Sequence, residues 1–173
     1  MKFINKIINK LGNSSRKKKV VDTLYESIEK LKIGIFGAMY NKYINMYDEE
    51  YSKLLCGAII SELLLEEHQM EVVRNFYSVN RDLVREEIIK LNEDEHFSRA
   101  FSYLYAAKIF YLATTTGKIV SDEGYQILER ANELRIYIPN TYDISGDNNM
   151  INCVYKISEY ADNLLNQELR NYS

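Results

Sequence analysis

Apolar side chains recur along this chain every three to four residues, which is the period of an α-helix. The densest run is Leu54–Leu65, whose only strongly polar side chain is Glu62. A helix that is apolar on nearly all sides is buried in a protein interior. The run is too short to cross a bilayer, which needs about 20 mostly apolar residues. The pattern therefore predicts a central buried helix over about 49–76, with one carboxylate on its inner face.

Other stretches show the same period and are bounded by residues that start or stop helices. They predict helices over about 20–47, 80–91, 95–116 and 148–172, and one more that starts near Ser121 and ends before Pro139. The helix over 95–116 is rich in Ala, Phe and Tyr, which suits large-into-small packing against the central helix. Gly34 and Gly37 lie one turn apart and leave a flat place where another helix can approach closely.

Composition supports this assignment. The 173 residues suit one domain. One Pro and seven Gly are few for the many turns of an all-β protein. We therefore predict an all-α fold, a single-domain bundle of six or seven helices with short connections.

Charge divides the chain into two parts. Residues 1–19 carry seven basic side chains and no acidic one. The whole chain has 22 basic and 25 acidic residues, so residues 20–173 hold 15 and 25 and have a net charge of −10. We predict a basic amphipathic N-terminal arm (1–19) and an acidic helical domain (20–173). An acidic body argues against nucleic-acid binding, which needs a basic face.

The N-terminal arm has an apolar face beside its basic residues. One interpretation is a segment that docks on a partner or on an anionic membrane surface. The other, which we favour, is a terminal helix packed on the domain and followed by a solvated basic turn. The candidate membrane or partner residues are Lys2, Phe3, Lys6, Ile7, Lys10, Arg16, Lys17, Lys18 and Lys19.

Four tyrosines recur at helical spacing: Tyr40, Tyr43, Tyr47 and Tyr51. They form one stripe if the helix continues through Asp48. Asp48 and the two glutamates after it also resemble an N-cap with an acidic first turn, which would place a break there. Tyrosine is common at interfaces, so the four are candidate interaction residues. A half-buried seam with its hydroxyls at the rim is the plainer explanation.

Glu62 is the sharpest candidate for chemistry. Burial disfavours the charged form of an unpaired carboxylate, and such groups collect at functional sites. The structural interpretation, which we favour, is a salt bridge to a neighbouring helix through Lys108 or another base, which would fix the helix register. The functional interpretation is a small-ligand binder or an enzyme.

The sequence gives little support for disulfides, metal sites, a catalytic nucleophile or a phosphate-binding loop. Cys56 and Cys153 have no CxxC partner, so we expect reduced thiols in a reducing compartment. Glu93 and His96 form Glu-x-x-His, but a di-iron bundle needs two such motifs. The sequence also lacks a nucleophile elbow and a P-loop. We predict no catalytic residue, no metal and no cofactor.

One short segment has a familiar pattern. Within Ala113–Leu128, an alanine-containing helix is followed by Gly117-Lys118-Ile119 and then Asp122-Glu123. This segment resembles the helix–loop–helix of TerB-like helical domains, in which an acidic loop follows an alanine-rich helix. The Asp that the family has before the glycine is Thr116 here, and the similarity covers under a tenth of the chain. The resemblance implies no function for the chain.

These observations predict a non-enzymatic protein-binding module: an adaptor, a regulator or an immunity-type inhibitor that acts through an acidic helical surface in a bacterial-type cytoplasm. Charge complementarity would suit a basic protein partner. The first alternative is peripheral membrane association through residues 1–19, at the inner face of the membrane. The second is a ligand binder or enzyme that uses Glu62. Self-association is compatible with all three.

Overall fold

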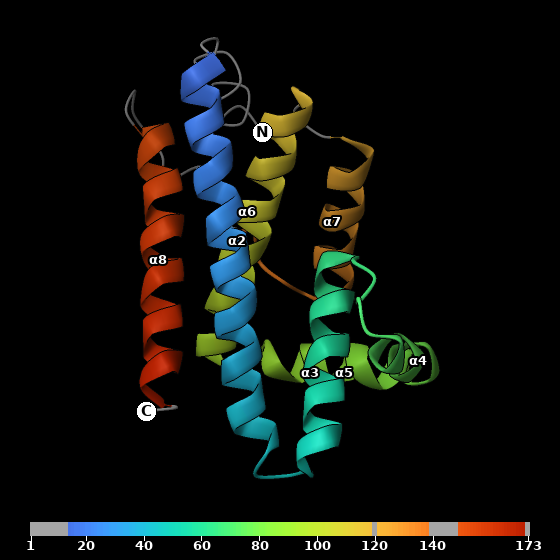
Figure 1. Ribbon diagram of the computed structural model, residues 1–173. Helices are drawn as coiled ribbons and strands as arrows, with labels where there is room; N and C mark the ends of the chain where they lie inside the picture. Colours follow the sequence, from blue (N-terminus) through green and yellow to red (C-terminus); the bar gives the residue numbers. More distant parts are fainter. Residues whose placement is uncertain (1–13, 119–120, 139–148, 172–173) are drawn as a thin grey trace.

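A computed structural model describes residues 14–118, 121–138 and 149–171 (Figure 1). These residues form an all-helical bundle with no strand among them, which confirms the predicted fold class. The helices are α2 (Ser14–Tyr43), α3 (Glu49–Leu64), α4 (Glu71–Val79), α5 (Arg81–Leu91), α6 (Glu95–Thr116), α7 (Asp122–Glu133) and α8 (Asn149–Asn171).

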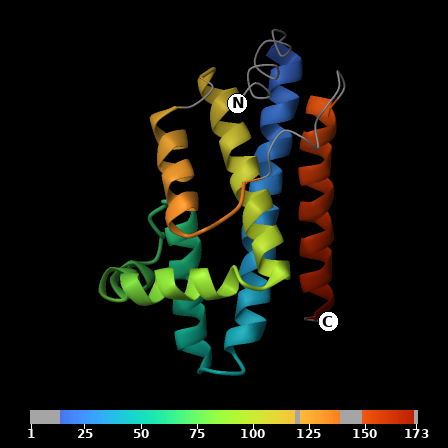
Figure 2. The same ribbon diagram turned by 180° about the vertical axis from the view of Figure 1, so that it is seen from behind.

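Helix α2 is the centre of the bundle. It packs against α8, α6 and α3, and views from opposite sides show α8 and α6 running beside it (Figures 1 and 2). Full burial of one large apolar side chain stabilises a fold by about 1.5–3 kcal/mol. The stripe that α2 buries therefore contributes several times this amount to the stability of the bundle. Its fully enclosed members are Leu24, Leu31, Ile35, Met39 and Tyr43.

The predicted pairing of Leu54–Leu65 with residues 97–112 is wrong. Helix α3 packs mainly against α4, α2 and α5, whereas α6 packs mainly against α2. The Tyr105 hydroxyl of α6 does reach α3, where it donates a hydrogen bond to the Leu63 carbonyl at 2.5 Å. Apolar content made α3 look central, but the longer helix α2 has more surface to bury. Helix α5 crosses the direction of the long helices (Figure 2).

The close approach predicted at Gly34 and Gly37 is confirmed, and α8 is the helix that approaches. A Cβ atom on Gly34 would lie 2.8 Å from Leu164 Cγ, closer than packed atoms allow. A Cβ on Gly37 would lie 3.3 Å from Glu168 Oε2. The missing side chains let α8 lie directly on the backbone of α2.

The helix ends follow local signals. Asp48 caps α3, because its side chain accepts a hydrogen bond from the Tyr51 amide at 2.7 Å. Ser121 caps α7 by accepting from the Gly124 amide at 3.0 Å. Gly117 ends α6 with a φ of 69°, a left-handed conformation that glycine adopts freely.

The predicted helix over 49–76 is interrupted, so that prediction is wrong beyond Leu64. Leu65 adopts the left-handed conformation (φ 57°), and the Glu66 amide donates to the Ser61 carbonyl at 3.2 Å. The chain becomes helical again at Glu71. Arg74 holds the turn between the two helices by donating from Nη1 to the carbonyls of His68 and Gln69, each at 2.8 Å.

Most of the predicted N-terminal arm lies outside the described residues. This holds for Lys2, Phe3, Lys6, Ile7 and Lys10. Residues 14–19 belong to the first turns of α2, where Lys18 and Lys19 are exposed. Among the helices that the structure describes, none is both long enough and apolar enough to cross a membrane.

Gly34→Ala tests the contact between α2 and α8. Alanine favours helix by about 1 kcal/mol over glycine, but overpacking costs about 1–3 kcal/mol. We expect Gly34→Ala to lower the free energy of unfolding in the wild-type background, as measured by urea denaturation. In a Leu164→Ala background, where the obstructing side chain is gone, the same change should raise it. Equal effects in both backgrounds would contradict the close approach.

Candidate functional site

Glu62 lies in the last turn of α3 and has no exposed surface. Carrying an isolated carboxylate into a protein interior is costly, and the cost is offset only by close opposite charge and hydrogen bonds. The surroundings of Glu62 therefore decide whether it is a structural or a reactive group.

Three arginines and a tyrosine surround this carboxylate. Arg130 of α7 places Nη1 2.5 Å from Glu62 Oε1, and the same nitrogen donates to the Glu62 carbonyl at 2.8 Å. Arg85 and Arg81 of α5 approach with their Nε atoms at 3.5 and 3.8 Å. The Tyr77 hydroxyl of α4 donates to Glu62 Oε2.

A second carboxylate completes this group. Glu133 Oε2 pairs with Arg85 Nη2 and lies 3.6 Å from Arg130 Nε. We call these six residues the Glu62 cluster: Glu62, Tyr77, Arg81, Arg85, Arg130 and Glu133. Three guanidinium groups face two carboxylates, so the cluster keeps one net positive charge.

The geometry favours the structural interpretation of Glu62. Its carboxylate is enclosed, so it cannot touch a ligand in this conformation. The nearest basic partner is Arg130, and Lys108 pairs with Glu66 and Glu123 instead. Through Glu62, the C-terminal end of α3 is joined to α4, α5 and α7.

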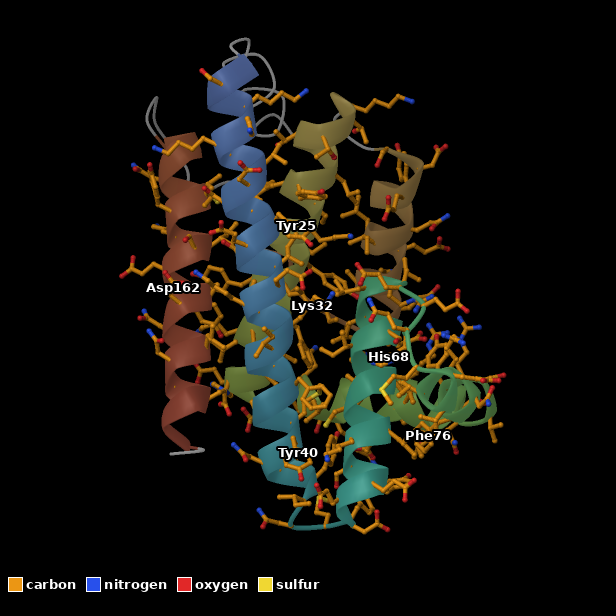
Figure 3. All side chains as sticks on the ribbon, viewed as in Figure 1. Tyr25, Lys32, Tyr40, His68, Phe76 and Asp162 are labelled. Atoms are coloured by element: carbon orange, nitrogen blue, oxygen red, sulfur yellow. The ribbon has the colours of Figure 1, made fainter. Side chains whose placement is uncertain are left out.

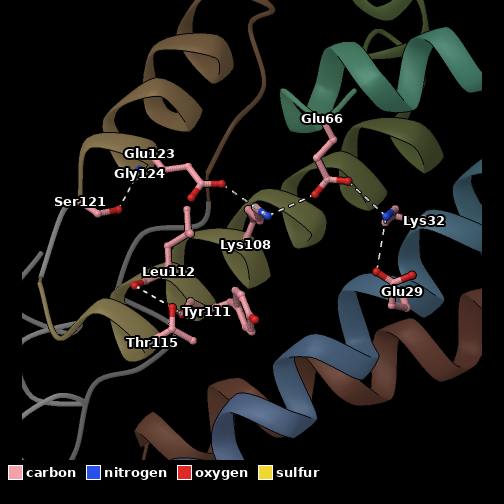
Figure 4. Close-up of polar contacts among 10 residues, drawn as sticks. All are labelled: Glu29, Lys32, Glu66, Lys108, Tyr111, Leu112, Thr115, Ser121, Glu123 and Gly124. Carbon is pink, nitrogen blue, oxygen red and sulfur yellow. Dashed lines mark hydrogen bonds and ion pairs between the residues drawn. The ribbon is translucent and has the colours of Figure 1, made fainter. Parts of the chain in front are cut away.

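Lys108 belongs to a separate chain of ion pairs (Figure 4). Its Nζ lies 3.3 Å from Glu66 Oε1 and 3.9 Å from Glu123 Oε1. The other Glu66 oxygen lies 3.3 Å from Lys32 Nζ, which also approaches Glu29 at 3.4 Å. Burial alone would lower the pKa of Lys32, but the charges of Glu66 and Glu29 outweigh it and raise that pKa. These pairs tie the α3–α4 turn to α2, α6 and α7.

A cleft of about 470 Å³ lies on one side of this turn, between α2 and α3. We call it the α2–α3 groove. Ile33 and Met70 are exposed along it, with exposed fractions of 57% and 58%, and the half-buried Phe36 and Ile60 also line it. Its polar side chains are Glu29, Lys32, Ser61, Glu66, Glu67, His68 and Gln69. Figure 3 labels Lys32 and His68, which mark its two sides.

A second cleft, of about 590 Å³, lies on the other side of the same turn. We call it the arginine cleft. Arg74, Arg81 and Arg130 line it together with Tyr77 and Ser78. Glu66, Glu67, His68 and Ser61 line both clefts, so the α3–α4 turn is the wall between them.

The four candidate tyrosines do not share one helix, because α2 ends at Tyr43 and α3 begins after Asp48. Tyr43 is fully buried and donates from its hydroxyl to Glu87 at 3.1 Å; burial and the Glu87 charge raise its pKa. The ring centroids of Tyr47 and Tyr51 lie 4.8 Å apart, with the two planes tilted by 57°. Tyr40 is half-buried. Their role in binding stays a prediction.

The metal-binding motif considered at Glu93 and His96 gains no further ligands. In the described part of the chain, no three His, Cys, Asp or Glu side chains lie close enough to hold a metal ion together. His96 packs its ring edge-on against Phe97, with centroids 5.5 Å apart.

Sequence reasoning missed the arginines. Arg81 and Arg85 are four residues apart and therefore share one face of α5. Arg130 lies three residues after the buried Ile127, on the side of α7 that faces the core. The available signal was that α5 and α7 each carry an arginine among their apolar, core-facing residues. An arginine at such a position needs an acidic partner inside the protein.

Comparisons with models of protein families, with curated proteins and with solved structures find no match to this chain. The similarity of residues 113–128 to TerB-like domains therefore stays a local one.

Glu62→Gln tests the cluster. Removing one partner of a buried ion pair leaves the other charges unpaired, which costs about 3 kcal/mol. We expect Glu62→Gln to lower the free energy of unfolding by about that amount. Glu66→Gln is the matched control, because Glu66 is partly exposed and such pairs are worth under about 1 kcal/mol. Similar losses for both variants in chemical denaturation would contradict the structural role of Glu62.

Proposed function

We propose that this protein is a non-enzymatic protein-binding module that holds a basic amphipathic segment of its partner in the α2–α3 groove. The observation that supports this most directly is the pairing of exposed apolar side chains, Ile33 and Met70, with glutamates at the groove rim. Apolar surface rimmed by polar residues is typical of protein interaction sites.

The floor of the groove suits side chains of a partner helix. Phe36 and Ile60 are half-buried and line the groove together with Ile33 and Met70, so an inserted apolar side chain would meet several apolar side chains. A helix docks in such a groove through apolar residues spaced three to four apart. Burial of the exposed groove residues would supply the affinity.

The charged side chains at the edge of the α2–α3 groove determine which charge a partner segment needs. Three glutamates line the groove with Lys32: Glu66 is paired with Lys32 and Lys108, Glu29 approaches Lys32, and Glu67 lies 3.5 Å from Arg74. Glu67 is largely exposed beside the groove. The net charge of residues 20–173 adds attraction at longer range, and such fields steer association. A partner segment with Lys or Arg beside its apolar residues fits this rim.

The cellular setting is part of the same proposal. Cys56 and Cys153 are not bridged by a disulfide. Unbridged cysteines are typical of a reducing compartment. We therefore propose that the binding takes place in a bacterial-type cytoplasm.

The double variant Ile33→Ser/Met70→Ser tests the groove. It removes two exposed side chains and leaves the core intact, so the helix content by circular dichroism should not change. In pull-downs from the native cells, we expect a basic partner that the wild type retains to be lost, with affinity at least about tenfold weaker, equal to 1.4 kcal/mol. Tyr155→Ser on α8, exposed at 53%, is the matched control and should retain the partner.

Charge reversal gives an independent test with the same captured partner. We expect Glu67→Lys to slow association and to reduce its dependence on salt, because a rim charge acts mainly on the association rate. Glu86→Lys, an exposed position on α5 away from the groove, is the control. Retention of the partner by the groove variant, or equal association rates for the two charge variants, would contradict the proposal.

A further inference from the structure

We propose that the arginine cleft binds a small oxyanion group, a phosphate or a carboxylate. This site is separate from the α2–α3 groove and needs no partner protein. Guanidinium groups recognise both anions through pairs of parallel N–H donors.

Two of the three arginines in this cleft are held in place by the fold. Arg130 is fixed through Nη1 by the Glu62 carboxylate and carbonyl. Arg74 is fixed through Nη1 by the carbonyls of His68 and Gln69. Among the described residues, neither Nη2 atom has a hydrogen-bond acceptor. Both side chains line the cleft, so they offer ordered donors without a further loss of side-chain entropy.

Arg81 is the least engaged of the three. Its side chain is 52% exposed, and its one ion pair, with Glu62 Oε2, is 3.8 Å long. It forms no hydrogen bond to another described residue. Arg81 lines the same cleft as Arg74 and Arg130, so its weakly engaged guanidinium group is free to bind an incoming anion there.

The charge balance also favours an anion. Arg81, Arg85 and Arg130 face Glu62 and Glu133, which leaves one positive charge in the Glu62 cluster. Arg74 lies 3.5 Å from Glu67, which balances it. Glu66 also lines the cleft, but its two oxygens are directed to Lys32 and Lys108 (Figure 4).

The enclosed Glu62 explains how this cluster can exist in the free protein. Without a central carboxylate, Arg81, Arg85 and Arg130 would repel one another. With it, the cluster is stable and still short of one negative charge. An oxyanion bound at Arg81 would supply that charge, and the hydroxyl of Ser78, at the same cleft, can donate a further hydrogen bond.

The test is a titration followed by the NMR signals of the arginine Nε–H groups. Inorganic phosphate and acetate are the probes, and sodium chloride of equal ionic strength is the baseline. We expect saturable shifts of Arg74, Arg81 and Arg130 with phosphate in the wild type. Saturation with acetate as well would assign the site to oxyanions in general, and its absence would assign it to phosphate.

Variants connect the shifts to the cleft. Arg81→Ala should weaken phosphate binding about tenfold or more, because it removes a charge-assisted hydrogen bond to the anion. Arg81→Gln provides the same test with a side chain of similar length if the alanine variant does not fold. Arg99→Ala on α6, with a side chain exposed at 59%, is the control and should bind as the wild type does.

Two results would overturn the proposal. One is a linear response to phosphate and acetate that equals the response to chloride. The other is equal phosphate affinity of the Arg81 variants and Arg99→Ala. The groove variant Ile33→Ser/Met70→Ser should keep its phosphate affinity, so failure of the protein-binding proposal and failure of this one are distinguishable.

Discussion

The arrangement of α3, α4, α5 and α7 depends on the pairing of one buried carboxylate with arginines from other helices. Glu62 on α3 meets Tyr77 on α4, Arg81 and Arg85 on α5, and Arg130 on α7. Apolar burial specifies that helices pack, but it tolerates several arrangements of similar helices. A buried charge is stable only beside its partners, so it disfavours arrangements in which those partners are absent. The cluster thereby fixes how the short helices are placed beside the long ones.

The α3–α4 turn takes its shape from charges on both of its sides. Arg74 holds its carbonyls, and Glu66 is held by Lys32 and Lys108. The left-handed Leu65 allows the chain to leave α3 sharply, at a cost of about 1–2 kcal/mol for a residue other than glycine. The result is a thin wall with an apolar, acid-rimmed groove on one face and guanidinium groups on the other. Two surfaces of opposite chemistry therefore lie within one turn of each other.

The predictable parts of the fold are those that local chemistry decides. Ser121 and Gly117 mark helix ends through their own side-chain or backbone properties, and the limits predicted for the helix over 95–116 are those of α6. The close approach at Gly34 and Gly37 also follows from the residues themselves. The end of α3 at Leu64 does not, because no glycine or proline stands there and the turn is held by residues distant in sequence. For the same reason Glu62 was recognisable as an unexplained buried acid, whereas Arg130, although it lies on the core-facing side of α7, could not be matched to it across 68 residues of sequence.

The contact between α2 and α8 also determines when the bundle can be completed. Lys30 and Asp162, which pair across this contact, are 132 residues apart in the chain. During synthesis, α2 leaves the ribosome long before α8, and the glycine face that α8 covers stays open in the interval. Contacts of such long sequence separation slow folding, and surface exposed in the meantime promotes association between chains. The close contact that makes the finished bundle tight therefore leaves the glycine face of α2 uncovered in the nascent chain until α8 has been made.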